Sequence, residues 1–516
     1  MFIDARRIPQ DKIIETEVCI IGAGAAGITL AREFIGRPFR VCLLESGGLI
    51  YDVETQALYK GEITGIPYDP LHVNRVRYFG GTTNHWSGWC RPLDDIDFEK
   101  REWVPYSGWP FGKSHLAGYY KRAQRICQVG EQDYDPERWQ TDDARPLPFK
   151  GEHTTATIFR HSPPTRFGLV YRDEIERAQN INTYLHANVV DIETTDPANT
   201  VTRVRVACLD GNKFWVVAKL FVLATGGIEN ARLLLLSNKV QKTGLGNQND
   251  LVGRFFTDHP GFDAGGFLLS DPRTSIGFYL GNTLVQGKRF TGGITLSPEV
   301  LRREGLVNLC ALIYKTDWPG VYAKPAARAL IRRREYGHFW RYVADAITNI
   351  DDMAVSTYRK MFNPEARRQL FMLVTVIEPA PNPDSRVTLG TETDALGKNR
   401  VRLHWQLGRL DRHSVSRAQE LFATEFGYSG LGRVLITTGD DNDVPMYTFG
   451  DHHMGTTRMH VDPKQGVVDE NCRVHGISNL FVAGSSVFPT FGYSQPTLTI
   501  VALALRLAEK IRGIMS

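Results

Sequence analysis

The chain has 516 residues, with 61 Lys and Arg against 57 Asp and Glu and a formal net charge of +4 at pH 7. This length exceeds the size at which one hydrophobic core usually stops growing, so we expect two interlocked domains. No long run of like charge accompanies the small net charge. This excludes the electrostatic pattern that is typical of a nucleic-acid-binding protein.

The seven cysteines form no C-x-x-C pair, and their odd number favours free thiols in a reducing compartment over a disulfide framework. They predict no metal site. The N-terminal segment has no apolar stretch with a small-residue cleavage site, and no run of about 18 apolar residues occurs. We therefore expect a cytoplasmic protein without a transmembrane segment.

Residues 17–44 have the pattern of a βαβ unit, and a glycine turn follows the first strand. Gly22, Gly24 and Gly27 form a G-x-G-x-x-G motif, in which the backbone can approach a pyrophosphate at the helix N-terminus. Glu45 ends the second strand, where its carboxylate can accept hydrogen bonds from a ribose diol and would repel a 2′-phosphate. The motif predicts a dinucleotide other than NADP, and does not separate FAD from NAD.

The rest of the chain alternates between strand-rich and helical segments. Residues 181–225 predict a β-meander that returns to the first sheet. Residues 262–445 predict a second domain of strands with one basic helical stretch at Arg328–Arg341. We interpret this stretch as a solvated helix face; the alternatives are a lid, an oligomer contact or a surface for an acidic partner. Residues 479–516 predict a strand, a loop and an apolar helix after Pro496, so the first domain is discontinuous.

Further blocks carry a family resemblance. They are RYFGGTTNHWSG at 77–88, LATGGIENARLLLLS at 223–237 with VGRFFTDHP at 252–260, and a C-terminal stretch that starts with DHHMGTTRM at 451–459. With these blocks the chain resembles the glucose-methanol-choline (GMC) oxidoreductases from residue 17 to about residue 510. The resemblance implies one FAD.

The implied fold class is α/β. A Rossmann-like FAD-binding domain with a β-meander is expected at 12–261, including a flavin loop at 77–90, and again at 446–516, where the catalytic histidine loop lies. An α+β substrate domain built on an antiparallel sheet is expected at 262–445.

The resemblance also implies which residues contact FAD. They are Gly22, Gly24, Ala25, Ala26, Gly27, Glu45, Ser46, Gly80, Gly81, Thr82, Asn84, His85, Trp86, Val189, Thr225, Gly226, Gly484, Ser485, Gln495 and Thr497. In the sugar-oxidising branch of the family, the histidine of a similar T-H-W triplet carries the flavin covalently. His85 is therefore expected either to bind FAD covalently or to pack beside the flavin ring. Many members have an acidic residue at the position of Gly484, so the contact there falls to the backbone and Ser485.

Oxidation of an alcohol needs a base that takes the hydroxyl proton. His452 lies three residues before Gly455, in the register of the family's catalytic histidine, and an imidazole with a pKa near 6.5 suits this task. We interpret His453 as structural. The family's second His or Asn is Gln495 here; a glutamine amide can hold the substrate oxygen but cannot act as a base.

The expected reaction is FAD-dependent oxidation of a CH–OH group to an aldehyde or ketone, with hydride transfer to flavin N5 and His452 as the general base. The similarity to the sugar-oxidising branch favours a sugar, glycoside or polyol as substrate. Oxygen, a quinone or a separate redox protein would accept the electrons. The alternatives are a lyase or decarboxylase on the same flavin fold and a non-catalytic flavoprotein.

Overall fold

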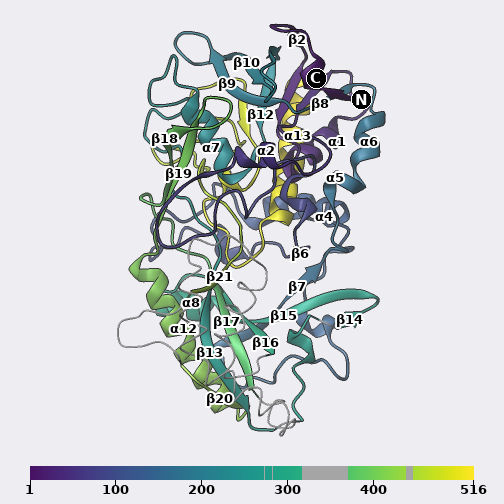
Figure 1. Cartoon of the computed structure of the whole chain (residues 1–516). Helices are drawn as coiled ribbons and strands as arrows, with labels where there is room; N and C mark the ends of the chain where they lie inside the picture. Colours follow the sequence, from purple (N-terminus) through teal and green to yellow (C-terminus); the bar gives the residue numbers. More distant parts are fainter. Residues whose placement is uncertain (272, 282, 316–369, 437–445) are drawn as a thin grey trace.

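The structure is a computed structural model, and it describes residues 1–271, 273–281, 283–315, 370–436 and 446–516. The basic stretch Arg328–Arg341 lies outside the described residues. The described chain forms two parts that lie one above the other in Figure 1.

The upper part is centred on a six-stranded sheet whose strands all run parallel, in the order β1-β8-β4-β3-β12-β22. The bounds are Phe2–Asp4 for β1, Val18–Ile21 for β3, Val41–Leu44 for β4, Ile181–Leu185 for β8, Leu220–Leu223 for β12 and Leu480–Val482 for β22. Every residue of β3, β4, β12 and β22 is buried, as expected for parallel strands that are covered on both faces.

Helices cover this sheet. The predicted βαβ unit is present, because α1 (Ala25–Phe34) connects the parallel neighbours β3 and β4. The C-terminal helix α13 (Thr497–Met515) packs against α1 and α4 (Ala117–Ile126), and Figure 1 shows it running beside the sheet. The shorter helices of the chain's first half are α2 (Val53–Ala57), α3 (Asp95–Phe98), α5 (Phe167–Val170) and α6 (Arg172–Arg177).

Two smaller sheets flank the parallel sheet. The first has the order β2-β11-β10-β9, and its three later strands form the predicted meander, from which β12 returns to the parallel sheet. Its strands are β2 (Ile13–Glu15), β9 (Asn188–Thr194), β10 (Val201–Ala207) and β11 (Lys213–Val217). The second has the order β18-β19-β5, with β5 at Gly61–Gly65, β18 at Arg386–Thr393 and β19 at Asn399–Trp405. Helix α7 (Gly226–Leu236) packs against β9 and β18.

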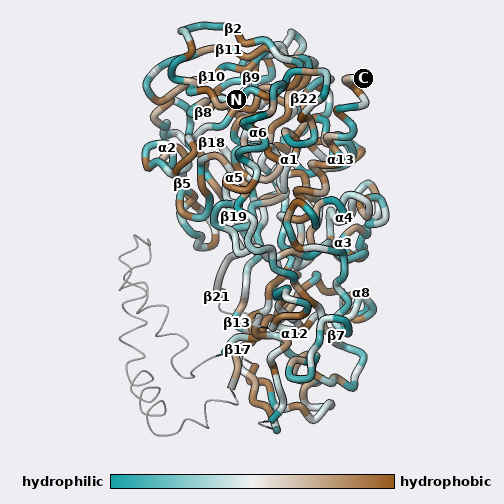
Figure 2. Tube along the Cα trace, turned by 90° about the vertical axis from the view of Figure 1, so that its right-hand side faces the viewer, coloured by the Kyte–Doolittle hydropathy of each residue, from teal (hydrophilic) through white to brown (hydrophobic). Residues whose placement is uncertain are grey.

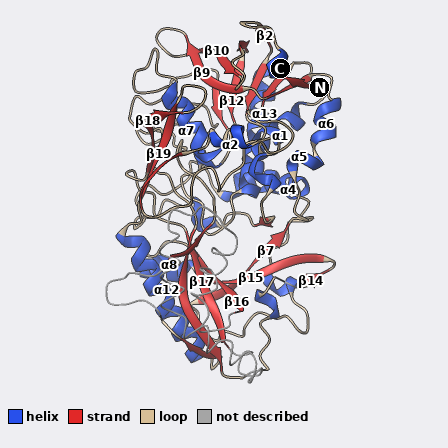
Figure 3. Cartoon of the chain, in the orientation of Figure 1, coloured by secondary structure: helices blue, strands red, loops and turns tan. Residues whose placement is uncertain are grey.

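The lower part is a nine-stranded antiparallel sheet, with the path β20-β13-β17-β16-β15-β7-β6 and with β14 and β21 paired beside it. The bounds are Trp89–Cys90 for β6, Thr154–His161 for β7, Pro260–Leu269 for β13, Leu284–Val285 for β14, Lys288–Leu296 for β15, Leu309–Lys315 for β16, Leu370–Ile377 for β17, Gly432–Val434 for β20 and Met446–Phe449 for β21. Helix α12 (Arg409–Tyr428) packs along β13, β17 and β20, and Figure 3 shows it with α8 (Pro298–Glu304) beside these strands. The predicted combination of a parallel and an antiparallel sheet is confirmed.

Each part has its own large hydrophobic cluster. In the rotated view of Figure 2 the two parts stay distinct, and hydrophobic segments occur in both. The strand pairing crosses the predicted domain boundary at 262. Strands β6 and β7 precede this boundary but join the antiparallel sheet, whereas β18 and β19 follow it but pair with β5. The residue pattern of one segment cannot reveal such pairing, because the pairing joins strands that are far apart in sequence. The domain boundaries stay a prediction.

None of the helices in the described ranges is long and apolar enough to cross a bilayer. All seven cysteines are buried and unpaired.

Candidate active site

One cavity of about 650 Å³ lies where segments from both ends of the chain meet. Its walls include the turn after β3, the segment 73–78, the loop 450–453 and the start of α13. Of the predicted site residues, the following line it: Gly22, Gly24, Ala25, Ala26, Glu45, Ser46, Gly81, Thr82, His85, Trp86, Val189, Thr225, Gly226, His452, Gly484, Ser485, Gln495 and Thr497. Tertiary structure thus brings the glycine motif and the proposed base to the same cavity.

Three predicted contacts do not line the cavity; they shape its walls. A Cβ on Gly27 would lie 1.9 Å from the carbonyl oxygen of Gly22, so this glycine serves close packing of the helix on the turn. Gly80 has φ 101°, a left-handed conformation that favours glycine. The Asn84 amide donates to the Phe79 carbonyl at 2.8 Å, which closes the loop that follows Gly80.

The glycine turn is built from backbone geometry. Gly22 has φ 102°, and a Cβ there would lie 2.5 Å from the Ala224 carbonyl oxygen. The Glu45 carboxylate accepts hydrogen bonds at 2.9 Å from the backbone N–H groups of Ala23 and Gly47, which hold it at the end of β4. Burial raises the pKa of Glu45, and these two hydrogen bonds oppose that shift. The carboxylate is therefore held in place beside the turn.

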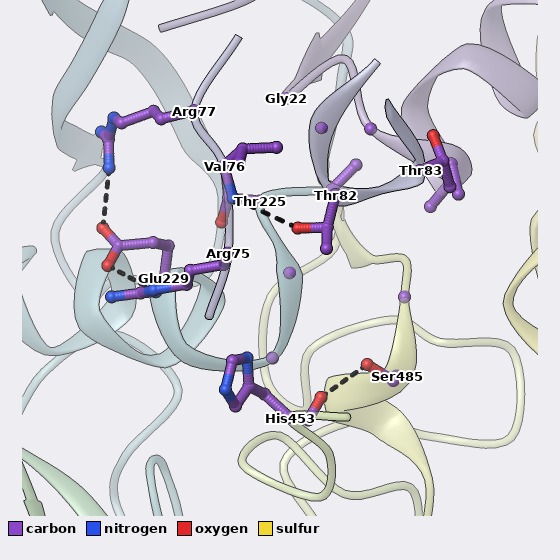
Figure 4. Close-up of a pocket in the computed structure, with 18 of the residues that line it drawn as sticks. Gly22, Arg75, Val76, Arg77, Thr82, Thr83, Thr225, Glu229, His453 and Ser485 are labelled. Atoms are coloured by element: carbon purple, nitrogen blue, oxygen red, sulfur yellow. Dashed lines mark hydrogen bonds and ion pairs between the residues drawn. The ribbon is translucent and has the colours of Figure 1, made fainter. Parts of the chain in front are cut away.

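A charged wall of the cavity was missed by the sequence analysis. Arg75 lies 3.0 Å and Arg77 3.4 Å from carboxylate oxygens of Glu229, and Figure 4 shows the three side chains together. Burial opposes ionisation of Glu229, but the neighbouring arginines lower its pKa to about 2. Arg77 also donates to the Ser46 hydroxyl at 2.5 Å. Arg77 is the first residue of the predicted flavin loop and Arg75 lies two residues before it, and this position is the signal in the sequence that points to them.

His452 lies on the cavity wall, in the loop 450–453. Its backbone N–H donates to the Asp258 carboxylate at 2.7 Å, and its Nδ1 lies 2.9 Å from Nδ1 of His259. Burial lowers the pKa of His452 to about 4, so the ring is neutral at pH 7. Sequence analysis did not single out His259, which lies within the 252–260 block. A neutral imidazole on the cavity wall can accept a proton.

Gln495 and the start of α13 also line the cavity. The Oε1 atom of Gln495 is buried and has no hydrogen-bond partner among the described residues. Pro496, with φ −72°, directly precedes the first helical residue Thr497, so the N-terminus of α13 faces the cavity. The helix dipole therefore favours negative charge at this place.

His453 also lines the cavity. Its ring stacks on Phe256 with centroids 5.9 Å apart, and its carbonyl accepts a hydrogen bond from the Ser485 hydroxyl at 2.6 Å, as Figure 4 shows. Burial lowers the pKa of His453 to about 3, and its buried Nε2 has no partner within the described part of the chain. The interpretation of His453 as structural stays a prediction.

His85 stands on the exposed rim of the cavity, where its Nε2 lies 3.0 Å from the Tyr78 hydroxyl.

The cavity's residues fit an FAD. A Cβ on Gly24, Gly226 or Gly484 would meet no atom of the described residues within 4 Å, so the backbone is open to a ligand at three places along the wall. Buried polar atoms without partners among the described residues also line it, at Asn74 and Gln495. Buried polar groups are nearly always paired in native proteins, so these atoms call for a polar ligand.

Comparison with known proteins agrees with this geometry. Residues 381–504 match the family described as GMC oxidoreductase, and residues 17–243 match the family described as FAD dependent oxidoreductase. The fructose dehydrogenase large subunit of Gluconobacter japonicus is 24% identical in an alignment that covers 97% of this chain and 98% of that protein. The 2-methyl-1,2-propanediol dehydrogenase of Mycolicibacterium austroafricanum is 25% identical in an alignment that covers 96% of this chain and 95% of that protein.

A formate oxidase structure from Aspergillus oryzae shares the fold, with a TM-score of 0.56, 16% identity and coverage of 97% of this chain and 98% of that one. By these matches the chain is similar to the GMC oxidoreductases, and it is an FAD-dependent oxidoreductase of CH–OH groups.

Proposed function

We propose that the protein oxidises a CH–OH group of a sugar, glycoside or polyol to an aldehyde or ketone, with His452 as the general base. The observation that carries this proposal is that His452 and Gln495 share one cavity with Gly22, Gly24 and Glu45, although more than half of the chain separates them in sequence. The fructose dehydrogenase and the propanediol dehydrogenase are named for substrates with more than one hydroxyl group, which supports this substrate class.

Bound FAD supplies the hydride acceptor for this reaction. The residues Gly22, Gly24, Glu45, Thr225 and Ser485 would hold it along the cavity. Oxygen, a quinone or a separate redox protein then takes the electrons.

The protein's own part is to take a proton and to hold the substrate. A hydroxyl group does not lose its proton unaided at neutral pH, and the neutral imidazole of His452 accepts that proton as the C–H bond breaks. The Oε1 atom of the Gln495 amide has no partner in the part of the chain that the structure describes, so it is available to bind a hydroxyl group of the substrate. Trp86 and Trp89 also line the cavity, and their faces suit stacking against the C–H groups of a sugar ring.

Covalent attachment of FAD through His85 is a separate part of the proposal. The ring stands on the rim of the cavity, where a flavin edge could reach it, and a covalent bond would fix the position of the flavin. Acid precipitation tests this part. Flavin that stays with the denatured wild-type protein and is released from His85→Ala would support the bond; release from both proteins would exclude it.

The main test is an anaerobic titration of the flavin-loaded protein with sugars, glycosides, polyols and simple alcohols, monitored by the absorbance of oxidised flavin. We expect one substrate class to bleach the flavin. We expect His452→Ala to lower the rate of bleaching by about 10²- to 10⁴-fold with its flavin retained. His413→Ala is the matched control, since His413 is exposed on α12. Bleaching that is equally fast in His452→Ala would exclude His452 as the base, and no bleaching by any compound would favour a non-redox role.

A further inference from the structure

We propose that His259 is a positioning residue that fixes the tautomer of His452, so that the unprotonated Nε2 of His452 faces the cavity. The inference rests on the proposed function, because it assumes that His452 is the base. It adds a second histidine to the active site. This histidine does not lie at the position of the family's usual second His or Asn, because Gln495 occupies that position here.

The geometry consists of two hydrogen bonds in series. Nε2 of His259 lies 2.8 Å from the carbonyl oxygen of Gly492, and Nδ1 of His259 lies 2.9 Å from Nδ1 of His452. The two rings are nearly perpendicular, at 89°, with their centroids 5.1 Å apart. His259 is 3% exposed, so water does not compete for either nitrogen.

The proton positions follow from the end of this series. A carbonyl oxygen can only accept, so Nε2 of His259 must carry a proton that it donates to Gly492. A neutral imidazole carries one proton, which leaves Nδ1 of His259 as an acceptor. Nδ1 of His452 must then be the donor of the bond between the rings, so Nε2 of His452 carries the lone pair.

The electrostatics agree with a neutral pair. Burial, followed by the proximity of His452, lowers the pKa of His259 to about 4. A doubly protonated His259 would reverse the bond between the rings and place a proton on Nε2 of His452. At neutral pH this state is rare, so the accepting tautomer of His452 prevails.

The surroundings hold both rings in place. One Asp258 carboxylate oxygen accepts the backbone N–H of His452 at 2.7 Å and that of His259 at 2.6 Å, and the other oxygen accepts the Tyr68 hydroxyl at 2.5 Å. The loop that carries Gly492 is anchored where the Phe491 N–H donates to Glu378 at 2.6 Å. The hydrogen bonds of His452 within the described residues use its backbone N–H and Nδ1, so Nε2 is available to substrate at the cavity wall.

An isosteric pair of variants tests the role. In His259→Asn, Oδ1 occupies the place of the ring Nδ1 and can accept from His452, whereas His259→Leu has similar size and no acceptor. Both variants remove the donor to Gly492, so this loss is matched. The measurement is anaerobic flavin reduction at pH 7 over a range of substrate concentrations, with flavin content and Tm recorded for each protein.

We expect His259→Leu to reduce the flavin about 100-fold more slowly than wild type at saturating substrate, with an unchanged half-saturation concentration. His259→Asn should stay within about tenfold of wild type. Equal rates in the two variants, whether fast or slow, would overturn the inference, because the acceptor atom would then be irrelevant. If His452→Ala is inactive while His259→Leu is fast, only this inference fails; if His452→Ala is fast, the proposed function fails as well.

A second measurement does not depend on whether a variant at residue 259 folds. In wild-type protein with ¹⁵N-labelled histidine, protonated and bare ring nitrogens have well-separated NMR shifts, and the His452 signals are those that His452→Ala lacks. A protonated Nδ1 with a bare Nε2 supports the inference, and the reverse tautomer overturns it.

Discussion

Two parts of the cavity wall, which we call the backbone end and the side-chain end, are built by different means. The end near Gly22 and Gly24 is formed by backbone, since glycines provide the turn and the open wall. The end near His452 and Gln495 is formed by side chains whose protonation and hydrogen bonding matter. Substitutions at the backbone end therefore change steric fit and backbone conformation, whereas substitutions at the side-chain end change protonation and hydrogen bonding.

The largest expected effect is at the backbone end, and a pair of variants separates folding from binding. Gly22→Ala forces a Cβ to 2.5 Å from the Ala224 carbonyl at φ 102°, so we expect a loss of about 3 kcal/mol or more of unfolding free energy. The Cβ of Gly24→Ala meets no atom of the described chain within 4 Å and lies at the cavity wall, so the apoprotein should keep its Tm within about 2 °C and bind FAD at least about tenfold more weakly. Thermal unfolding and FAD titration check both; an equal loss of Tm in the two variants would contradict the comparison.

An intermediate effect is expected from the histidines at the side-chain end. The folded-state pKa of His259 is about 4, below the ordinary value of 6.5, so between these pH values the unfolded chain binds a proton that the folded protein does not. Stability is therefore lost as the pH falls below about 6.5. Between pH 7 and pH 5 this amounts to about 2 kcal/mol for one such histidine.

His259→Asn removes this contribution. Urea unfolding should show that the difference in unfolding free energy between wild type and variant changes by about 2 kcal/mol from pH 7 to pH 5, in favour of the variant. His413→Ala, which changes an exposed histidine, serves as the control. A pH-independent difference would show that His259 is not held neutral by burial.

The smallest expected effect is at Gln495. If Oε1, which has no partner among the described residues, binds substrate, Gln495→Ala loses one hydrogen bond, and kcat/KM per bound flavin should fall about tenfold. Steady-state kinetics on the best substrate of the panel check this. Unchanged kinetics would leave His452 as the main polar contact to the substrate.

Much of the upper part could be predicted from local signals. The apolar strands β3 and β4, the glycine turn between them and α1, and the helix after Pro496 are all patterns among near neighbours, and they lie close to where the sequence placed them. The pairing of β6 and β7 with the antiparallel sheet was not predicted, because Trp89–Cys90 and Thr154–His161 carry no local sign of their partners.

The sequence by itself determined the dinucleotide-type glycine motif and Glu45 at the end of the next strand, and the resemblance of its 451–459 block to a known family singled out His452. Each depends on residue type and short spacing, which backbone geometry converts directly into structure. Only the tertiary structure decided that His259 meets His452 across 193 positions of the chain, and that Arg75 and Arg77 share Glu229 at the cavity wall. Such contacts depend on how the strands are ordered and paired, and no local pattern of residues specifies that order.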